Sequence, residues 1–298
     1  MPEKYKVAIC MITYNHEKFI GQAIEGIMNQ QADFAIQLYI GEDCSTDRTR
    51  NICEQYRQQY PDKITLLLPD KNLGVQRNLK KTLQACDGEY IAICEGDDYW
   101  IDEKKLQKQV DFLERNPDYA LSSHTSAILG HNKKMIYNPP LQRNTFTTTD
   151  IIDQDWEIMT ASLMFRKSAL TIPDWFVNIK NGDYALQLLL STQGKINYIP
   201  EYMSVYRRHW GGISLTFTPF ISSKAIYDLL NYFNKETDKR YRSNIKRKLK
   251  KIYRYYRQVA KENRLKKQYL GLTIAYYTSL IGIDSFSVIS EMPVFLKK

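Results

Sequence analysis

Short apolar segments alternate with helical segments over the first hundred residues, and this alternation limits the possible folds more than any other feature. Apolar runs predict four strands, at residues 7–12, 34–40, 63–68 and 91–94. The segments between them predict three helices, at residues 19–29, 46–60 and 75–86. Ser45 or Thr46 can cap the second of these helices. Such alternation is typical of an α/β unit with a parallel sheet.

Polar clusters follow three of these predicted strands, at residues 13–15, 42–43 and 95–98. In parallel sheets, ligands bind outside the carboxyl ends of the strands. The agreement between separate strands therefore predicts one ligand site at this edge of the sheet.

The third cluster holds three carboxylates within four positions, Glu95, Asp97 and Asp98. Carboxylates this close repel one another unless a cation or hydrogen-bond donors neutralise them. Their oxygen atoms suit Mg²⁺ or Mn²⁺ shared with a substrate phosphate. A strand-end turn rich in Asp is the alternative, because Asp is common in turns. The other two clusters favour the metal site.

The remainder of the chain predicts further elements of both kinds. We expect helices at residues 106–115 and 184–192, strands at 119–128 and 162–165, a loop over 130–150 and an extended segment at 196–205. From about residue 219 the pattern is helical to near residue 270. The fold class is thus α/β, with a mixed, mainly parallel sheet flanked by helices, in a domain at residues 1–220. A basic helical extension follows at residues 221–298.

Five cysteines, an odd number with no CxxC pair, favour a reduced and cytoplasmic chain over a disulfide framework or a zinc site. No run approaches the roughly 20 apolar residues that span a bilayer. We also expect no signal peptide, because a strand-like segment follows directly after residue 6.

Four ordered motifs carry a resemblance to a known family: residues 12–15 (ITYN), 41–49 (GEDCSTDRT), 72–78 (NLGVQRN) and 88–98 (GEYIAICEGDD). Together they resemble the family 2 glycosyltransferases, which are inverting enzymes of the GT-A fold, a Rossmann-like nucleotide-binding architecture. The match is close over residues 5–115 and thinner from Asp183 to His209. The resemblance implies transfer of a sugar from a nucleoside diphosphate donor to an acceptor hydroxyl.

The resemblance also implies roles for residues of the strand-end clusters. It assigns nucleotide binding to Thr13, Tyr14, Asn15, Asp43, Arg77 and Asp97, with metal binding as the alternative role for Asp97. It assigns the divalent metal, Mn²⁺ or Mg²⁺, to Asp98, with His209 as a further ligand. Glu42 and Glu95 stand where the family more often has Asp. For Asp43, a turn or cap role is the alternative.

Asp183 resembles the family's catalytic base, which lies just before a helix. Inverting transfer needs a carboxylate that deprotonates the acceptor. An N-cap role is the alternative for Asp183, and Asp174 is the competing base. Arg207 and Arg208 suit diphosphate binding because guanidinium groups match phosphate oxygens; a solvated charge run is the alternative.

Several other side chains have less specific interpretations. We expect His16, His124 and His131 to be structural or surface residues. Tyr99 and Trp100 either line a sugar site or pack in the core.

The net charge of +9 is concentrated near the C-terminus, since residues 224–270 contain 16 Lys and Arg against 4 Asp and Glu. Apolar residues at helical spacing make residues 239–267 a basic amphipathic helix. Peripheral contact with an anionic membrane surface and plain packing with a solvated basic face are both open. Nothing specific for bases accompanies the charge, so we expect no nucleic-acid partner.

The function predicted from the sequence is that of a metal-dependent hexosyl- or N-acetylhexosaminyl-transferase. We expect a UDP-sugar donor by default and a glycan or a lipid-linked glycan as acceptor. A sugar-phosphate nucleotidyltransferase is one alternative, but residues 13–16 do not form the Gly-rich loop that it would need. A non-catalytic scaffold on the membrane surface is the other.

Overall fold

The structure is a computed structural model that describes residues 5–153, 158–212 and 218–280. The chain forms two compact units, which we treat separately. The first comprises Met1–Thr148, Trp156–Asn178 and Leu186–His209, and the second comprises Thr149–Asp155, Ile179–Ala185 and Trp210–Lys298. The boundary near residue 220 stays a prediction.

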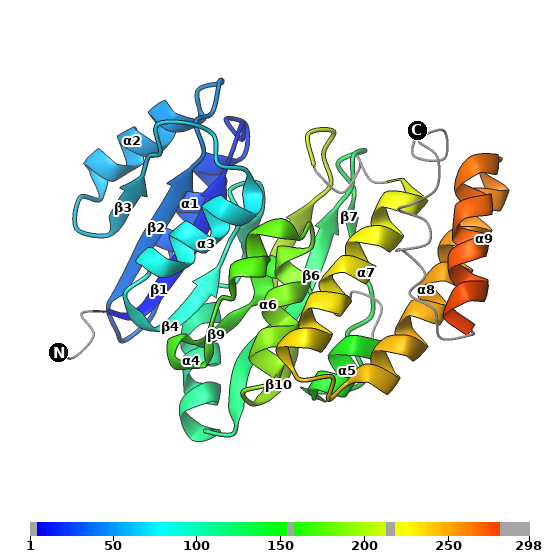
Figure 1. Cartoon of the computed structure of the whole chain (residues 1–298). Helices are drawn as coiled ribbons and strands as arrows, with labels where there is room; N and C mark the ends of the chain where they lie inside the picture. Colours follow the sequence, from blue (N-terminus) through cyan, green and yellow to red (C-terminus); the bar gives the residue numbers. More distant parts are fainter. Residues whose placement is uncertain (1–4, 154–157, 213–217, 281–298) are drawn as a thin grey trace. The chain divides into compact units, whose positions relative to one another are not determined.

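The first unit is built on one mixed sheet with the strand order β3-β2-β1-β4-β9-β6-β10-β5 (Figure 1). Its parallel part consists of β1 (Tyr5–Thr13), β2 (Ile36–Glu42), β3 (Ile64–Leu67) and β4 (Gly88–Ile93). The other long strands, β6 (Tyr119–Leu129) and β10 (Lys195–Arg207), are also parallel to each other. The short strand β9 (Met164–Arg166) is antiparallel to β4 and β6 and joins the two parallel parts.

Three two-residue strands complete the sheet: β5 (Tyr99–Trp100) and β8 (Thr145–Phe146) pair with β10, and β7 (Met135–Ile136) pairs with β6. The sequence predicts a loop over residues 130–150, and this prediction is wrong at β7, at β8 and at the first residues of helix α5 (Thr148–Asp153). Segments of two residues are too short to show the alternation of apolar and polar residues that identifies a strand.

Helices α1 (Ile20–Met28), α2 (Thr49–Gln59), α3 (Val75–Ala85) and α4 (Lys105–Arg115) flank the sheet. Each is amphipathic; in α1, Ile20, Ala23, Ile24 and Ile27 form the buried face. Within the described residues, 3₁₀ turns also occur at Thr160–Ser162, Lys167–Ala169 and Asp174–Asn178.

Strand β1 shows why the sheet is covered on both faces. Residues 7–13 of β1 are all buried, without the alternation of a half-exposed strand. A continuous buried run is what a parallel strand between two helical layers requires. The core therefore lies on both sides of β1 and holds the carboxyl ends of the strands in place.

The second unit contains α5 (Thr148–Asp153), α7 (Pro219–Glu236), α8 (Arg242–Glu262) and α9 (Lys266–Leu280). Helix α6 (Gly182–Ser191) has residues in both units. The last three helices pack side by side (Figure 1) around buried Tyr253 and Ala275. The segment from about residue 219 to near 270, predicted to be helical, thus divides between three helices, with positive φ angles at Asp238 (48°), Lys239 (63°) and Arg264 (58°) between them.

The start of α2 also differs from the sequence prediction. Neither Ser45 nor Thr46 caps the helix. Instead, Asp47 Oδ1 accepts a hydrogen bond from the backbone N–H of Thr49 at 2.9 Å. The hydroxyl of Ser45 accepts a hydrogen bond from the backbone N–H of Asn15, and the backbone N–H of Thr46 donates to Asn15 Oδ1. These two bonds connect the segments that follow β1 and β2.

Candidate functional site

The predicted polar clusters meet at one edge of the sheet in the first unit. The backbone N–H of Asp43 donates to the carbonyl of Thr13 at 3.0 Å, and that of Gly96 donates to the carbonyl of Ile12 at 3.0 Å. These bonds fix the residues that follow β2 and β4 beside the end of β1. The sequence prediction that the three strand ends adjoin is confirmed.

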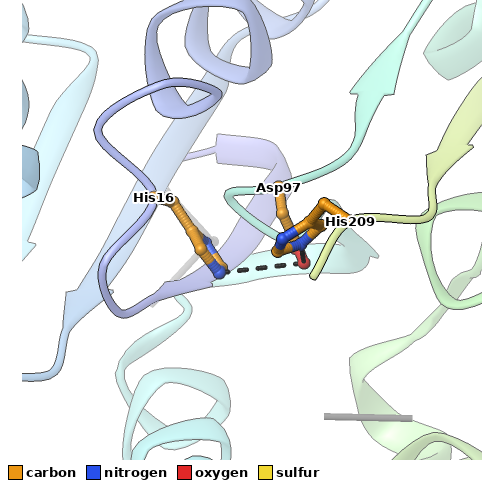
Figure 2. Close-up of side chains that lie close together, drawn as sticks. All are labelled: His16, Asp97 and His209. Atoms are coloured by element: carbon orange, nitrogen blue, oxygen red, sulfur yellow. Dashed lines mark hydrogen bonds and ion pairs between the residues drawn. The ribbon is translucent and has the colours of Figure 1, made fainter. Parts of the chain in front are cut away.

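Two histidines and one aspartate form a cluster at this edge, which we call the His-Asp-His cluster (His16, Asp97 and His209). Their side chains point toward one another from the segments that follow β1, β4 and β10 (Figure 2). Nε2 of His209 lies 3.0 Å from Asp97 Oδ2, and Nε2 of His16 lies 3.7 Å from the same oxygen. One potential ligand atom from each residue lies within 4.8 Å of the other two. The set therefore matches the donors that hold a divalent metal.

The electrostatics of the cluster favour an ionised Asp97. Burial alone raises the pKa of this carboxyl, but the hydrogen bond from His209 and the charges on His16 and His209 outweigh it, so the pKa lies below its ordinary value. Burial also lowers the pKa of His16, against the attraction of Asp97. A neutral imidazole beside a carboxylate is the state that binds a metal ion.

Asp98 lies next to the cluster in a different environment. It is 1% exposed, and its Oδ1 accepts a hydrogen bond from the backbone N–H of Arg207 at 2.8 Å. Burial and the charges of Asp97 and Glu95 raise its pKa well above the ordinary value. A cation near these carboxylates would favour the ionised form of Asp98. The residues present therefore fit a divalent metal ion.

Arg207 is buried and joins the end of β10 to the carboxylate turn. Its Nη1 donates to the Asp97 carbonyl at 2.6 Å, and its Nη2 donates to Gln22 Oε1. The guanidinium also lies 4.2 Å from the ring centroid of Tyr99. Its neighbour Arg208 is exposed. Both arginines were predicted to bind phosphate. In the structure, Arg207 forms hydrogen bonds with the turn after β4, whereas Arg208 is exposed to solvent.

The predicted nucleotide-binding residues line the ends of β1 and β2. The carboxylate of buried Asp43 accepts hydrogen bonds from the backbone N–H groups of Leu73 (2.7 Å) and Gly74 (2.9 Å). Asn15 adopts a positive φ of 56°, and its side-chain oxygen accepts from the N–H of Thr46 at 2.8 Å. Tyr14 is 43% exposed.

Thr13 and Arg77 complete the predicted nucleotide set. Thr13 is buried, with Oγ1 3.2 Å from His16 Nδ1. Arg77 is an exposed residue in the first turn of α3. The structure therefore places Thr13 against the His-Asp-His cluster and leaves Arg77 at the surface.

Three other residues weighed in the sequence analysis have structural partners. Glu42 is buried and forms an ion pair with Arg50 at 2.6 Å. Trp100 is buried, with Nε1 bonded to the carbonyl of Ala161 at 2.9 Å, which supports core packing. Asp174 is exposed and pairs with Lys80 at 3.2 Å.

Asp183 belongs to the second unit, in the first turn of α6. Burial raises the pKa of its carboxyl to about 6, although the backbone amides of Tyr184 and Asp183 act in the opposite direction. A carboxyl group with a pKa near neutrality is suited to accept a proton.

His16 is the candidate residue that the sequence analysis missed. It was expected to be a structural or surface residue, but it lies in one cluster with Asp97 and His209, which are about 80 and 190 residues further along the chain. Its position directly after the polar residues 13–15 was the available signal. His124, by contrast, is buried in β6, in agreement with a structural role.

The fold is of the GT-A class, and the candidate site lies at the carboxyl ends of its parallel strands. The model of Glycosyl transferase family 2 matches residues 8–171, more than half of the 298 residues. The chain belongs to this family.

Two relatives are similar to this chain in sequence. An uncharacterized protein of Mycobacterium tuberculosis (Rv1520) is 36% identical over 208 residues, which cover 70% of this chain and 60% of that protein. The putative glycosyltransferase EpsE of Bacillus subtilis is 36% identical over 114 residues, 38% of this chain and 40% of EpsE. The matched part of the chain thus spans less than two thirds of either relative.

Two solved structures share the fold. Residues 1–349 of Staphylococcus aureus TarS, in complex with UDP-GlcNAc, match with a TM-score of 0.70 at 16% identity, covering 92% of this chain and 81% of that chain. The mannosyltransferase PcManGT of Pyrobaculum calidifontis, in complex with GDP-Man and Mn²⁺, matches with a TM-score of 0.58 at 12% identity, covering 96% and 87%.

The contacts of Arg207 give a prediction about stability. In Arg207→Met, the Asp97 carbonyl and the Gln22 side chain lose a charged donor inside the protein. We expect the free energy of unfolding to fall by about 2–4 kcal/mol. Urea denaturation followed by circular dichroism measures it. The exposed neighbour provides the control, since Arg208→Met should stay within about 0.5 kcal/mol of the wild type. Equal stability of the two variants would contradict the role given to Arg207.

Proposed function

We propose that the protein transfers a sugar from a nucleoside diphosphate donor to an acceptor hydroxyl, with inversion at the anomeric carbon. The observation that carries the proposal is the His-Asp-His cluster beside Asp43 and Asn15 at the strand ends of a family 2 fold. Such an edge is where α/β sheets bind nucleotides. The donor's nucleoside would lie over residues 13–15 and Asp43, with its diphosphate toward Asp97.

The cluster would hold the metal through Asp97 and His209, with Asp98 adjacent. A bound divalent cation, Mn²⁺ or Mg²⁺, would offset the charge of the departing nucleoside diphosphate. Arg208, exposed beside His209, would bind a phosphate oxygen of the same group. Arg207 keeps Asp97 and Asp98 in place while the charge at the site changes.

The donor and acceptor follow from the family and the relatives. TarS was solved with UDP-GlcNAc, and RfbG of Shigella flexneri, 31% identical over 141 residues, is described as a dTDP-rhamnosyl transferase. We propose a UDP-hexose or UDP-N-acetylhexosamine donor. The acceptor would be a glycan or a lipid-linked glycan in the biosynthesis of a cell-surface polysaccharide, and the enzyme would act in the cytoplasm.

The second unit offers a basic surface for contact with a membrane. Leu249 and Tyr253 of α8 pack within the unit, so the opposite face of the helix is the one left to solvent. That face carries exposed cations and the exposed ring of Tyr255. Cations and tyrosine together suit the headgroup region of an anionic bilayer. No helix in the described part of the chain has both the length and the apolar character needed to cross a bilayer.

Asp183 is the proposed base, and its substitution tests the proposed reaction. Asp183→Asn should leave UDP binding unchanged and lower the transfer rate by about 10²–10⁴-fold, the usual contribution of a general base. Transfer by the wild type should also fall as the pH drops through about 6, where Asp183 becomes protonated. Asp174→Asn, at an exposed carboxylate, is the matched control and should retain full activity.

The transfer rate and the affinity for UDP are measured separately. Transfer of radiolabelled sugar from UDP-sugars gives the rate, and isothermal titration with UDP gives binding. Full activity of Asp183→Asn would remove Asp183 from the mechanism, and absence of any UDP-sugar turnover by the wild type would reject the proposed function.

Removing charge from α8 tests the membrane proposal. A variant with Gln at Lys251, Arg254 and Lys261, all exposed on α8, should bind vesicles of 40 mol% phosphatidylglycerol at least tenfold more weakly at low salt, because each cation contributes about 1 kcal/mol. A control removes three exposed lysines from the first unit, Lys63, Lys81 and Lys104. Co-sedimentation measures both. Equal weakening by the two variants would show a general charge effect and reject the surface on α8.

A further inference from the structure

The His-Asp-His cluster contains one more imidazole than the sequence resemblance implies. The resemblance places the metal on Asp98 and His209, with metal binding as one of two roles for Asp97, whereas the structure adds His16 from the segment after β1. Both imidazoles direct Nε2 at the same oxygen, Asp97 Oδ2, at 3.0 Å and 3.7 Å. Three segments that are distant in the chain therefore each contribute one potential metal-ligand atom to the same small region.

The orientation of His16 is suited to a ligand. Its Nδ1 lies 3.2 Å from Thr13 Oγ1, so its Nε2 is the nitrogen that faces Asp97. Metal-binding histidines are usually held this way, with the second ring nitrogen fixed by a polar neighbour. The backbone N–H of His16 also donates to Thr49 Oγ1 at 2.8 Å. This bond fixes the residue independently of its ring.

The spacing of the donors agrees with metal coordination. Bonds of about 2.1 Å separate neighbouring ligands by roughly 3 Å and opposite ligands by roughly 4 Å. The distances of 3.0 Å and 3.7 Å to Asp97 Oδ2, with every pair of atoms within 4.8 Å, are close to this range. Small side-chain rotations would bring all three atoms onto one ion.

We propose that His16 is a third protein ligand and that the site selects a first-row transition-metal ion over Mg²⁺. Imidazole nitrogen suits the transition metals, whereas Mg²⁺ takes oxygen ligands and retains its waters. Two nitrogens and one carboxylate oxygen therefore disfavour Mg²⁺ relative to Mn²⁺ and Co²⁺. The proposal rests on the proposed function, because it names the metal preference of that same site.

Metal binding without nucleotide tests the proposal on the full chain. Isothermal titration of the wild type should show Mn²⁺ and Co²⁺ binding at least tenfold more tightly than Mg²⁺. His16→Gln should weaken Co²⁺ binding at least tenfold and change the visible absorption of bound Co²⁺, since one nitrogen leaves its coordination sphere. His131→Gln, at an exposed histidine, is the matched control and should leave both unchanged. Unfolding curves show whether each variant is folded.

A measurement on the wild type keeps the test valid even if His16→Gln does not fold. Electron spin-echo modulation of bound Mn²⁺ should reveal coupling to two imidazole nitrogens. A single coupled nitrogen, or unchanged Co²⁺ affinity and spectrum in folded His16→Gln, would show that His16 is not a ligand. Mg²⁺ binding as tight as Mn²⁺ and Co²⁺ binding would overturn the selectivity. An enzyme that binds Co²⁺ as expected but transfers no sugar would reject only the proposed function.

Discussion

The hydrogen bonds of Arg207 are the interaction on which the candidate site depends. Its backbone N–H holds the Asp98 carboxylate, and its guanidinium holds the carbonyl of Asp97. These bonds connect the last residue of β10 to the turn after β4, so the two strand ends keep one geometry. His209 follows two residues later and therefore reaches Asp97. The carboxylates of Asp97 and Asp98, which would otherwise repel each other, are thus held in place by the buried Arg207.

The same turn creates opposite environments for two neighbouring carboxylates. Asp97 faces two imidazoles and has a lowered pKa, whereas Asp98 points into the protein and has a raised pKa. A further positive charge would favour ionisation of both groups. A site that gains stability from a divalent cation is suited to a reaction in which a diphosphate leaves, because cation and diphosphate neutralise each other's charge.

The sequence predicted the sheet and the meeting of the strand ends because these depend on local patterns. The buried runs of β1 and β4 and the apolar face of α1 are each visible within about ten residues. The two-residue strands β7 and β8 carry no such pattern, and the breaks at Asp238 and Arg264 depend on backbone angles that non-glycine residues seldom adopt. The role of His16 depends on partners distant in the chain, which no local pattern records.

The proposed function requires that residues after β1, β2, β4 and β10 form one pocket for a cation and a nucleoside diphosphate. A crystal structure with UDP and Mn²⁺, with anomalous data collected at the manganese absorption edge, would locate both ligands. We expect one anomalous peak within bonding distance of Asp97 and His209, with the diphosphate on the same ion and the uracil near Asp43. A peak elsewhere, or UDP bound away from these strand ends, would rule out such a pocket.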